Sequence, residues 1–178
     1  YNIGADTSLL LWGVARGVDN MDDALAAERQ SLINEHGIPG SEFFFIDGSG
    51  GGDTTAQSRA VTKWLHIMTG QPDFQSFFDA LPILGIDGSL GFVTDFQSDP
   101  TLAGATGQVF AKTGTYAAGD ESGLIIKGQA FGGYIHAQSG RKLIYQLVVN
   151  EVPISEFNQL LDIFQDEGRI SAILWRDF

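Results

Sequence analysis

Cysteine is absent from this sequence of 178 residues, which excludes disulfide bridges, thiolate nucleophiles and cysteine-ligated zinc sites but leaves the cellular compartment open. Positive charge is scarce: 10 Lys and Arg residues stand against 22 Asp and Glu residues, for a formal net charge of -12. Such a chain repels polyanions, so nucleic-acid binding is disfavoured. No apolar run reaches the roughly 18 residues of a membrane span. The remaining composition, 43% apolar and 11% aromatic, is that of a chain with a packed core.

The start of the sequence is informative as well. The first residue is Tyr1 rather than Met, and the following residues lack the charged and apolar regions of a signal peptide. We therefore expect this chain to be a piece of a longer protein, cut at its start. Any targeting segment, and any chemistry carried upstream, would then lie outside it.

Residues 1–106 are predicted to be mainly helical. The short apolar run 43–46 predicts a buried strand, and the Gly- and Asp-rich stretch 82–107 is expected to be mostly irregular. Thr54 or Thr55 is placed to cap a helix. Apolar residues at helical spacing, bounded by capping residues and glycines, indicate helices at 5–14, 21–35, 54–69 and 74–81.

The hydrophobic period changes in residues 107–178. Pro153 is predicted to open a last helix, which 170–175 continues or packs beside. A tight turn is expected at Ser139-Gly140. Helices followed by a meander and a terminal helix predict an α/β (α+β) sandwich in one domain. Three antiparallel strands are expected, at 108–112, 129–137 and 142–150.

Several candidate sites fail on their spacing. The three histidines lie on three different predicted elements without an i, i+4 pair, so no metal is predicted. Lys112-Thr113 is not a phosphate-binding loop, because Ala111 stands where that motif needs Gly. A triad of Ser49, Asp47 and a histidine is disfavoured, since Ser49 lacks the Gly-x-Ser-x-Gly turn. No cofactor is predicted.

One motif stands out at the end of a predicted strand, Lys112-Thr113-Gly114-Thr115. Alone, a Lys-Thr-Gly match is common by chance. Here it belongs to an ordered series of blocks at 1–6, 45–50, 81–90, 112–115, 132–135 and 147–150. In order and spacing, the series resembles the C-terminal half of the serine D-alanyl-D-alanine carboxypeptidases of the class C penicillin-binding type, across almost all of residues 1–178.

The resemblance implies a β-lactamase/transpeptidase-like sandwich, in which an antiparallel sheet is flanked by helices and carries a helical subdomain, and which is incomplete in this chain. Its active site uses Ser-x-x-Lys with the nucleophile, Ser-x-Asn, and Lys-Thr-Gly. Asn2 would end Ser-x-Asn, with Tyr1 as the middle residue and the Ser just before the chain. The nucleophile would also lie upstream. The literal match from Ser139 to Lys142 is flanked by strands, whereas the motif needs Lys one helical turn after Ser.

The resemblance also implies roles for individual residues. The Thr115 backbone N–H would be one donor of the oxyanion hole, and Lys112 would supply positive potential toward the serine and the terminal carboxylate of the substrate. The Thr113 and Thr115 hydroxyls would bond that carboxylate, although strand alternation puts them on the face opposite Lys112 and Gly114. Gly114 would leave room for the substrate. Asn2 would hold the substrate's amide.

Two segments depart from the family pattern. The loop 47–50 resembles a segment near the cleft, but Gly51-Gly52-Asp53 replaces the usual Leu-Ser-Arg that follows it, which puts its role in doubt. Residues 117–128 look like an insert after the motif that borders the cleft, and we assign no chemistry to them.

By this resemblance, the expected function is that of a serine-type D-Ala-D-Ala carboxypeptidase or endopeptidase. It would act on peptidoglycan peptides through an acyl-enzyme, bind penicillins, and work outside the cytoplasm, in the periplasm or cell envelope. Its partners would be a peptidoglycan peptide or a β-lactam, and the upstream half of the same protein. Two alternatives stay open: a related serine esterase or D-aminopeptidase, and a noncatalytic module with the same fold.

Overall fold

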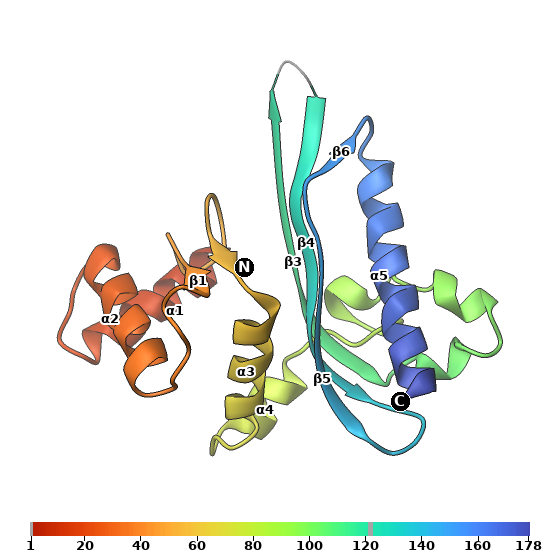
Figure 1. Cartoon of the computed structure of the whole chain (residues 1–178), viewed down its shortest axis with the longest axis horizontal. Coiled ribbons are helices and arrows are strands. Elements are labelled where there is room, and N and C mark those ends of the chain that lie inside the picture. Colours follow the sequence, from red (N-terminus) through yellow and green to blue (C-terminus); the bar gives the residue numbers. More distant parts are fainter. Residues whose placement is uncertain (1, 121–122) are drawn as a thin grey trace. The chain divides into compact units, whose positions relative to one another are not determined.

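The computed structural model describes residues 2–120 and 123–178 (Figure 1). The chain divides into two compact units, Tyr1–Ile67 and Met68–Phe178. The predicted α+β architecture, with antiparallel strands flanked by helices, is confirmed.

The first unit is built from helices and a two-stranded ribbon. Asn20 caps the second helix, since its side chain accepts a hydrogen bond from the backbone N–H of Asp23 at 2.9 Å. A small core forms around Ile38, Phe43 and Ala60. The elements are α1 (Asn2–Val14), α2 (Met21–Asn34), β1 (Phe43–Phe44), β2 (Thr55–Ala56) and α3 (Ser58–Met68).

Two expectations for this unit were wrong in detail. The strand predicted at 43–46 is only Phe43–Phe44, because it pairs with just two residues, Thr55 and Ala56. For the same reason neither Thr54 nor Thr55 caps a helix: Thr55 lies in β2, and α3 begins at Ser58. The ribbon takes the residues that sequence spacing assigned to the first turn of the helix.

The second unit is a sheet between helices. Strand β3 (Val109–Asp120) pairs with β4 (Gly123–His136), which pairs with both β5 (Lys142–Val149) and β6 (Val152–Ile154), all antiparallel. Helix α5 (Asn158–Asp177) runs along one face of this sheet (Figure 1). On the other face, Phe78 of α4 (Phe74–Asp79) packs against Phe110 in a tilted ring pair, with ring centroids 4.6 Å apart.

The core of the second unit lies between the sheet and α5. The stretch 82–107 is largely irregular, as expected, but it carries three short 3-10 helices and contributes heavily to this core. Among its residues, Leu84, Leu90, Val93 and Phe96 are 0% exposed. These side chains pack beneath β3 and α5, so the irregular stretch is a structural layer rather than a loop over the surface.

Two expectations for this unit were wrong. The described part of the sheet has four strands rather than three, because β6 also pairs with β4. Residues 117–120 and 123–128 of the expected insert lie in β3 and β4, which pair with each other on both sides of a bulge between Tyr116 and Ala117. Pro153 does not open the last helix but lies in β6, and α5 starts five residues later at Asn158. Residues 170–175 continue the last helix beyond Gly168, which was one of the two alternatives predicted from the sequence.

Candidate active site

The Lys-Thr-Gly motif lies on β3, which is an edge strand of the sheet. The backbone N–H of Ala111 points away from β4, since it donates to the Pro82 carbonyl oxygen at 3.0 Å. In an antiparallel strand every second residue directs its N–H and C=O to the same side. The register has no shift between Ala111 and Tyr116, so Thr113 and Thr115 also direct their N–H and C=O groups to the open edge. Among the described residues, the backbone N–H groups of Thr113 and Thr115 have no backbone partner at this edge.

Lys112 brings positive charge to this edge. Its side chain is exposed, and its ammonium group donates a hydrogen bond to the Thr113 carbonyl oxygen. Partial burial lowers the pKa of the Lys112 ammonium from its ordinary value, because desolvation disfavours the charged form. The cation is therefore tied to the motif's own backbone while still reaching solvent.

Thr113 does not offer a free hydroxyl. Its side chain is 7% exposed, and its hydroxyl donates to the Ser89 hydroxyl oxygen at 2.7 Å. Ser89 belongs to a short 3-10 helix (Gly88–Leu90) at the end of block 81–90. The sequence alone did not reveal Ser89 as the partner of Thr113, because only the fold brings together two residues that are 24 positions apart.

Gly114 borders open space. A Cβ atom built on Gly114 would meet nothing within 4 Å, whereas one built on Gly133 of β4 would overlap the Phe110 carbonyl oxygen and lie 2.7 Å from Ala111 Cα. Gly133 is therefore needed for strand packing, and Gly114 is not. The space beside Gly114 is free for a ligand to occupy.

The Thr115 side chain contacts a buried residue of the neighbouring strand. This side chain is exposed overall, yet its hydroxyl donates to Oε1 of Gln129, the residue directly opposite on β4. Gln129 is fully buried, as is Glu167 on α5. Burial raises the pKa of the Glu167 carboxyl to about 7, against a smaller lowering by the Gln129 side chain. Sequence reasoning missed both residues.

Asn2, the remaining predicted site residue, lies in the first unit at the start of α1 and is exposed. Tyr1, expected as the middle residue of Ser-x-Asn, lies outside the described residues. Near Asn2 in the chain, the Asp6 carboxylate accepts a hydrogen bond from the backbone N–H of Gly48 at 2.9 Å, which ties α1 to the loop 47–50.

Within the loop 47–50, partial burial raises the pKa of Asp47. Hydrogen bonds from Gly51, Gly50 and Ser49 outweigh this effect and hold the pKa of Asp47 below its usual value.

Ser139, the literal Ser-x-x-Lys serine, lies in the turn between β4 and β5, and its hydroxyl donates to the Phe178 carbonyl oxygen. Neither helix geometry nor a lysine one turn away is present there. In the structure as described, no three His, Asp or Glu side chains converge to hold a metal ion. None of the helices within residues 2–120 and 123–178 is long and apolar enough to cross a membrane.

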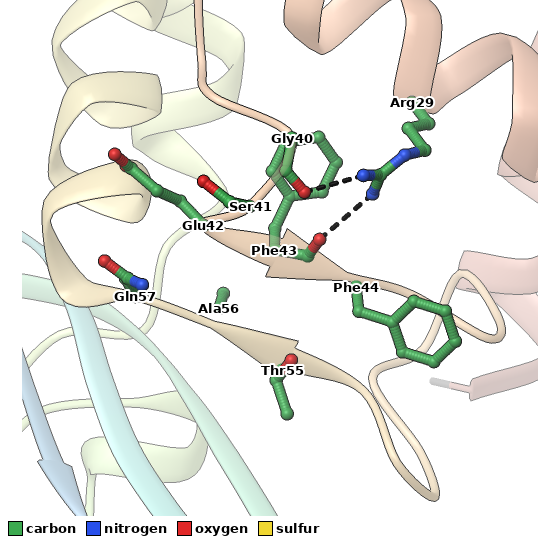
Figure 2. Close-up of a pocket in the computed structure, with 9 residues that line it drawn as sticks. All are labelled: Arg29, Gly40, Ser41, Glu42, Phe43, Phe44, Thr55, Ala56 and Gln57. Carbon is green, nitrogen blue, oxygen red and sulfur yellow. Dashed lines mark hydrogen bonds between the residues drawn. The ribbon is translucent and has the colours of Figure 1, made fainter.

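A shallow hollow in the first unit lies beside the ribbon of β1 and β2 (Figure 2). Arg29 donates to the carbonyl oxygens of Gly40 and Phe43, at 2.6 and 3.1 Å. Glu42 pairs with Arg59 at 2.9 Å. These charges are engaged in holding the ribbon, and none of the motif residues lines the hollow.

The sequence pattern of the family described as D-Ala-D-Ala carboxypeptidase 3 (S13) matches residues 2–165. The chain belongs to this family. Its fold is that of the penicillin-binding serine peptidases, consistent with the exposed Lys-Thr-Gly edge of β3. Among curated proteins, none matches the chain.

Solved structures agree on the fold. Penicillin binding protein 4 (dacB) from Haemophilus influenzae superposes with a TM-score of 0.66 at 18% identity, over 87% of this chain and 32% of that chain. Its complex with a novel β-lactam (CMV) gives 0.74 at 18% identity, over 97% of this chain and 37% of that chain. A class A β-lactamase from Bacteroides cellulosilyticus DSM 14838 gives 0.55 at 16% identity, over 89% and 55%. The chain spans about a third of the length of the penicillin binding protein 4 chains.

Proposed function

We propose that this chain supplies the Lys-Thr-Gly side of the active site in a serine-type D-Ala-D-Ala carboxypeptidase or endopeptidase. The enzyme would act on peptidoglycan peptides outside the cytoplasm, through an acyl-enzyme that penicillins also form. One observation carries the proposal: the edge of β3 offers the outward N–H of Thr115, the exposed cation of Lys112 and the open space at Gly114 within four consecutive residues.

The edge offers two of the parts that acyl transfer requires, an oxyanion donor and a cation for the substrate carboxylate. Attack on the penultimate D-alanine carbonyl creates a tetrahedral oxyanion. The Thr115 N–H can bind it without reorganisation, because this N–H points away from β4 and has no backbone partner among the described residues. The substrate chain can lie along β3 as an added strand, in the space that a side chain at Gly114 would fill. Lys112 then faces the substrate's terminal carboxylate with the opposite charge.

The nucleophile is proposed to lie outside these residues. The only Ser-x-x-Lys in the sequence starts at Ser139, in a turn whose flanks are strands. A segment upstream of Tyr1 would carry the helical Ser-x-x-Lys and the Ser of Ser-x-Asn, and residues 1–178 would form the C-terminal part of the same domain. Asn2 would contribute the amide that orients the substrate.

Replacement of the cation tests the proposal. In the full-length protein, Lys112→Ala should slow acylation by a fluorescent penicillin about 100- to 1,000-fold, the cost of removing one preorganised electrostatic group. Melting temperature should stay near the wild-type value, since the side chain is exposed. The matched control is Lys127→Ala, which removes a β4 lysine paired with Glu151 at 3.0 Å. Equal acylation rates for the Lys112 and Lys127 variants would reject the assignment.

A further inference from the structure

A line of polar side chains crosses the core of the second unit from the Lys-Thr-Gly edge to α5. It consists of Thr115 on β3, Gln129 on β4 and Glu167 on α5, and the last two are 0% exposed. A buried amide and a buried carboxylate are unfavourable among apolar side chains unless they interact with polar groups. Their place directly behind the motif gives them a partner at the active-site edge.

The register brings the first two residues together. Thr115 and Gln129 are opposite each other in the β3–β4 ladder, at a position where the Thr115 backbone groups point outward and the two side chains come close. The Thr115 hydroxyl donates to Gln129 Oε1. In the described chain, Gln129 Nε2 and both Glu167 carboxylate oxygens lack a partner at full hydrogen-bond geometry. The looser contact between this amide and this carboxylate still affects the Glu167 pKa.

An amide side chain has one accepting end and one donating end. Whichever end faces Glu167, the other end faces Thr115. The protonation state of Glu167 therefore sets the orientation of the Gln129 amide, and that orientation decides whether the Thr115 hydroxyl donates or accepts a hydrogen bond.

We propose that Glu167 is a positioning residue that acts through Gln129 to decide whether the Thr115 hydroxyl can donate to a substrate carboxylate. Ionised Glu167 attracts Nε2 and leaves Oε1 to take the Thr115 proton, as in the structure. Protonated Glu167 donates its own proton to Oε1, so the amide turns and Nε2 donates to the Thr115 oxygen. The hydroxyl proton is then free for the substrate. This inference rests on the proposed function.

Both states of Glu167 are accessible near neutral pH, because burial raises its pKa to about 7. The titratable group that faces it from β5 is Tyr145, which stays neutral since burial raises its pKa well above the ordinary value. From β3, Lys112 points to the other face of the sheet. Beside the 3-10 helices, Asp99 is engaged at the surface by Arg169 at 3.8 Å.

The test follows Thr115 directly in the full-length protein with threonine-selective 15N labelling. The Thr115 amide signal should titrate with an apparent pKa of about 7 in the wild type. It should be flat in Glu167→Gln and should titrate normally in Ser171→Ala, which removes a neighbouring buried hydroxyl of α5 without touching Gln129. Gln129→Met, which removes the amide, should also be flat and gives a second route if Glu167→Gln fails to fold.

Kinetics supply the second readout. For a peptide with a free terminal carboxylate, KM should rise severalfold as pH increases through the Glu167 pKa, with kcat unchanged, and this step should vanish in Glu167→Gln. A Thr115 signal that titrates alike in wild type and Glu167→Gln, or that never moves, overturns the inference. A second outcome rejects the proposed function instead: the Thr115 amide signal titrates, but the protein is not acylated by penicillin and does not bind the peptide. The role of Gln129 and Glu167 in substrate binding would then be rejected as well.

Discussion

The variant Gly114→Val distinguishes the contribution of Gly114 to folding stability from its contribution to ligand binding at the edge of β3. A Cβ at Gly114 meets nothing within 4 Å, so the larger side chain creates no clash inside the chain. Glycine weakens a strand by roughly 0.5–1 kcal/mol relative to a residue with a side chain, so the variant should be as stable as the wild type or up to about 1 kcal/mol more stable. Its side chain would, however, occupy the space where the substrate lies.

We expect Gly114→Val to lower kcat/KM for penicillin acylation at least about 100-fold, which corresponds to about 2.7 kcal/mol of lost transition-state stabilisation. The assay is the rate of covalent labelling in the full-length protein, beside its melting temperature. Gly133→Ala is the matched comparison, and should lose stability because its Cβ would lie 2.7 Å from Ala111 Cα. A stable Gly114→Val protein that is acylated at the wild-type rate would refute the argument that this edge binds the ligand.

Two further predictions concern Thr115 and Glu167. Thr115→Pro removes an N–H that faces the open edge and breaks no bond to β4, so acylation should fall about 100- to 1,000-fold with little unfolding, whereas Thr115→Val, which keeps the N–H, should fall far less. Burial raises the pKa of Glu167 from 4.5 to about 7 in the folded chain, so its neutral form favours folding. This contribution to the free energy of unfolding is complete below about pH 4.5 and is lost as pH rises to about 7. The free energy of unfolding of Glu167→Gln, measured by urea titration, should therefore exceed that of the wild type by up to about 3 kcal/mol at about pH 8. The difference should vanish near about pH 4.

Local signals in the sequence were sufficient for several elements. Asn20 and the acidic residues after it marked the start of α2, because capping depends only on neighbouring residues. The β3, β4 and β5 strands and the Ser139 turn followed from alternation and turn chemistry. The order of the motif blocks pointed to the family that the comparisons show.

The features that sequence reasoning missed depend on long-range pairing. Residues 117–120 and 123–128 looked like part of an insert, and only cross-strand pairing places them in β3 and β4. Pro153 suits either the first turn of a helix or a short strand, and pairing with Ile125 selects the strand. The Thr113–Ser89 bond and the Gln129–Glu167 contact require a known register and a packed α5, which no local pattern contains.

A crystal structure of the full-length protein acylated by a penicillin tests the central claim most directly. We predict an ester on a serine upstream of Tyr1, with its carbonyl oxygen about 2.7–3.1 Å from the Thr115 nitrogen, and the β-lactam carboxylate beside Lys112. An ester on any serine within residues 1–178, or a ligand bound away from the Lys112–Thr115 edge, would contradict the account.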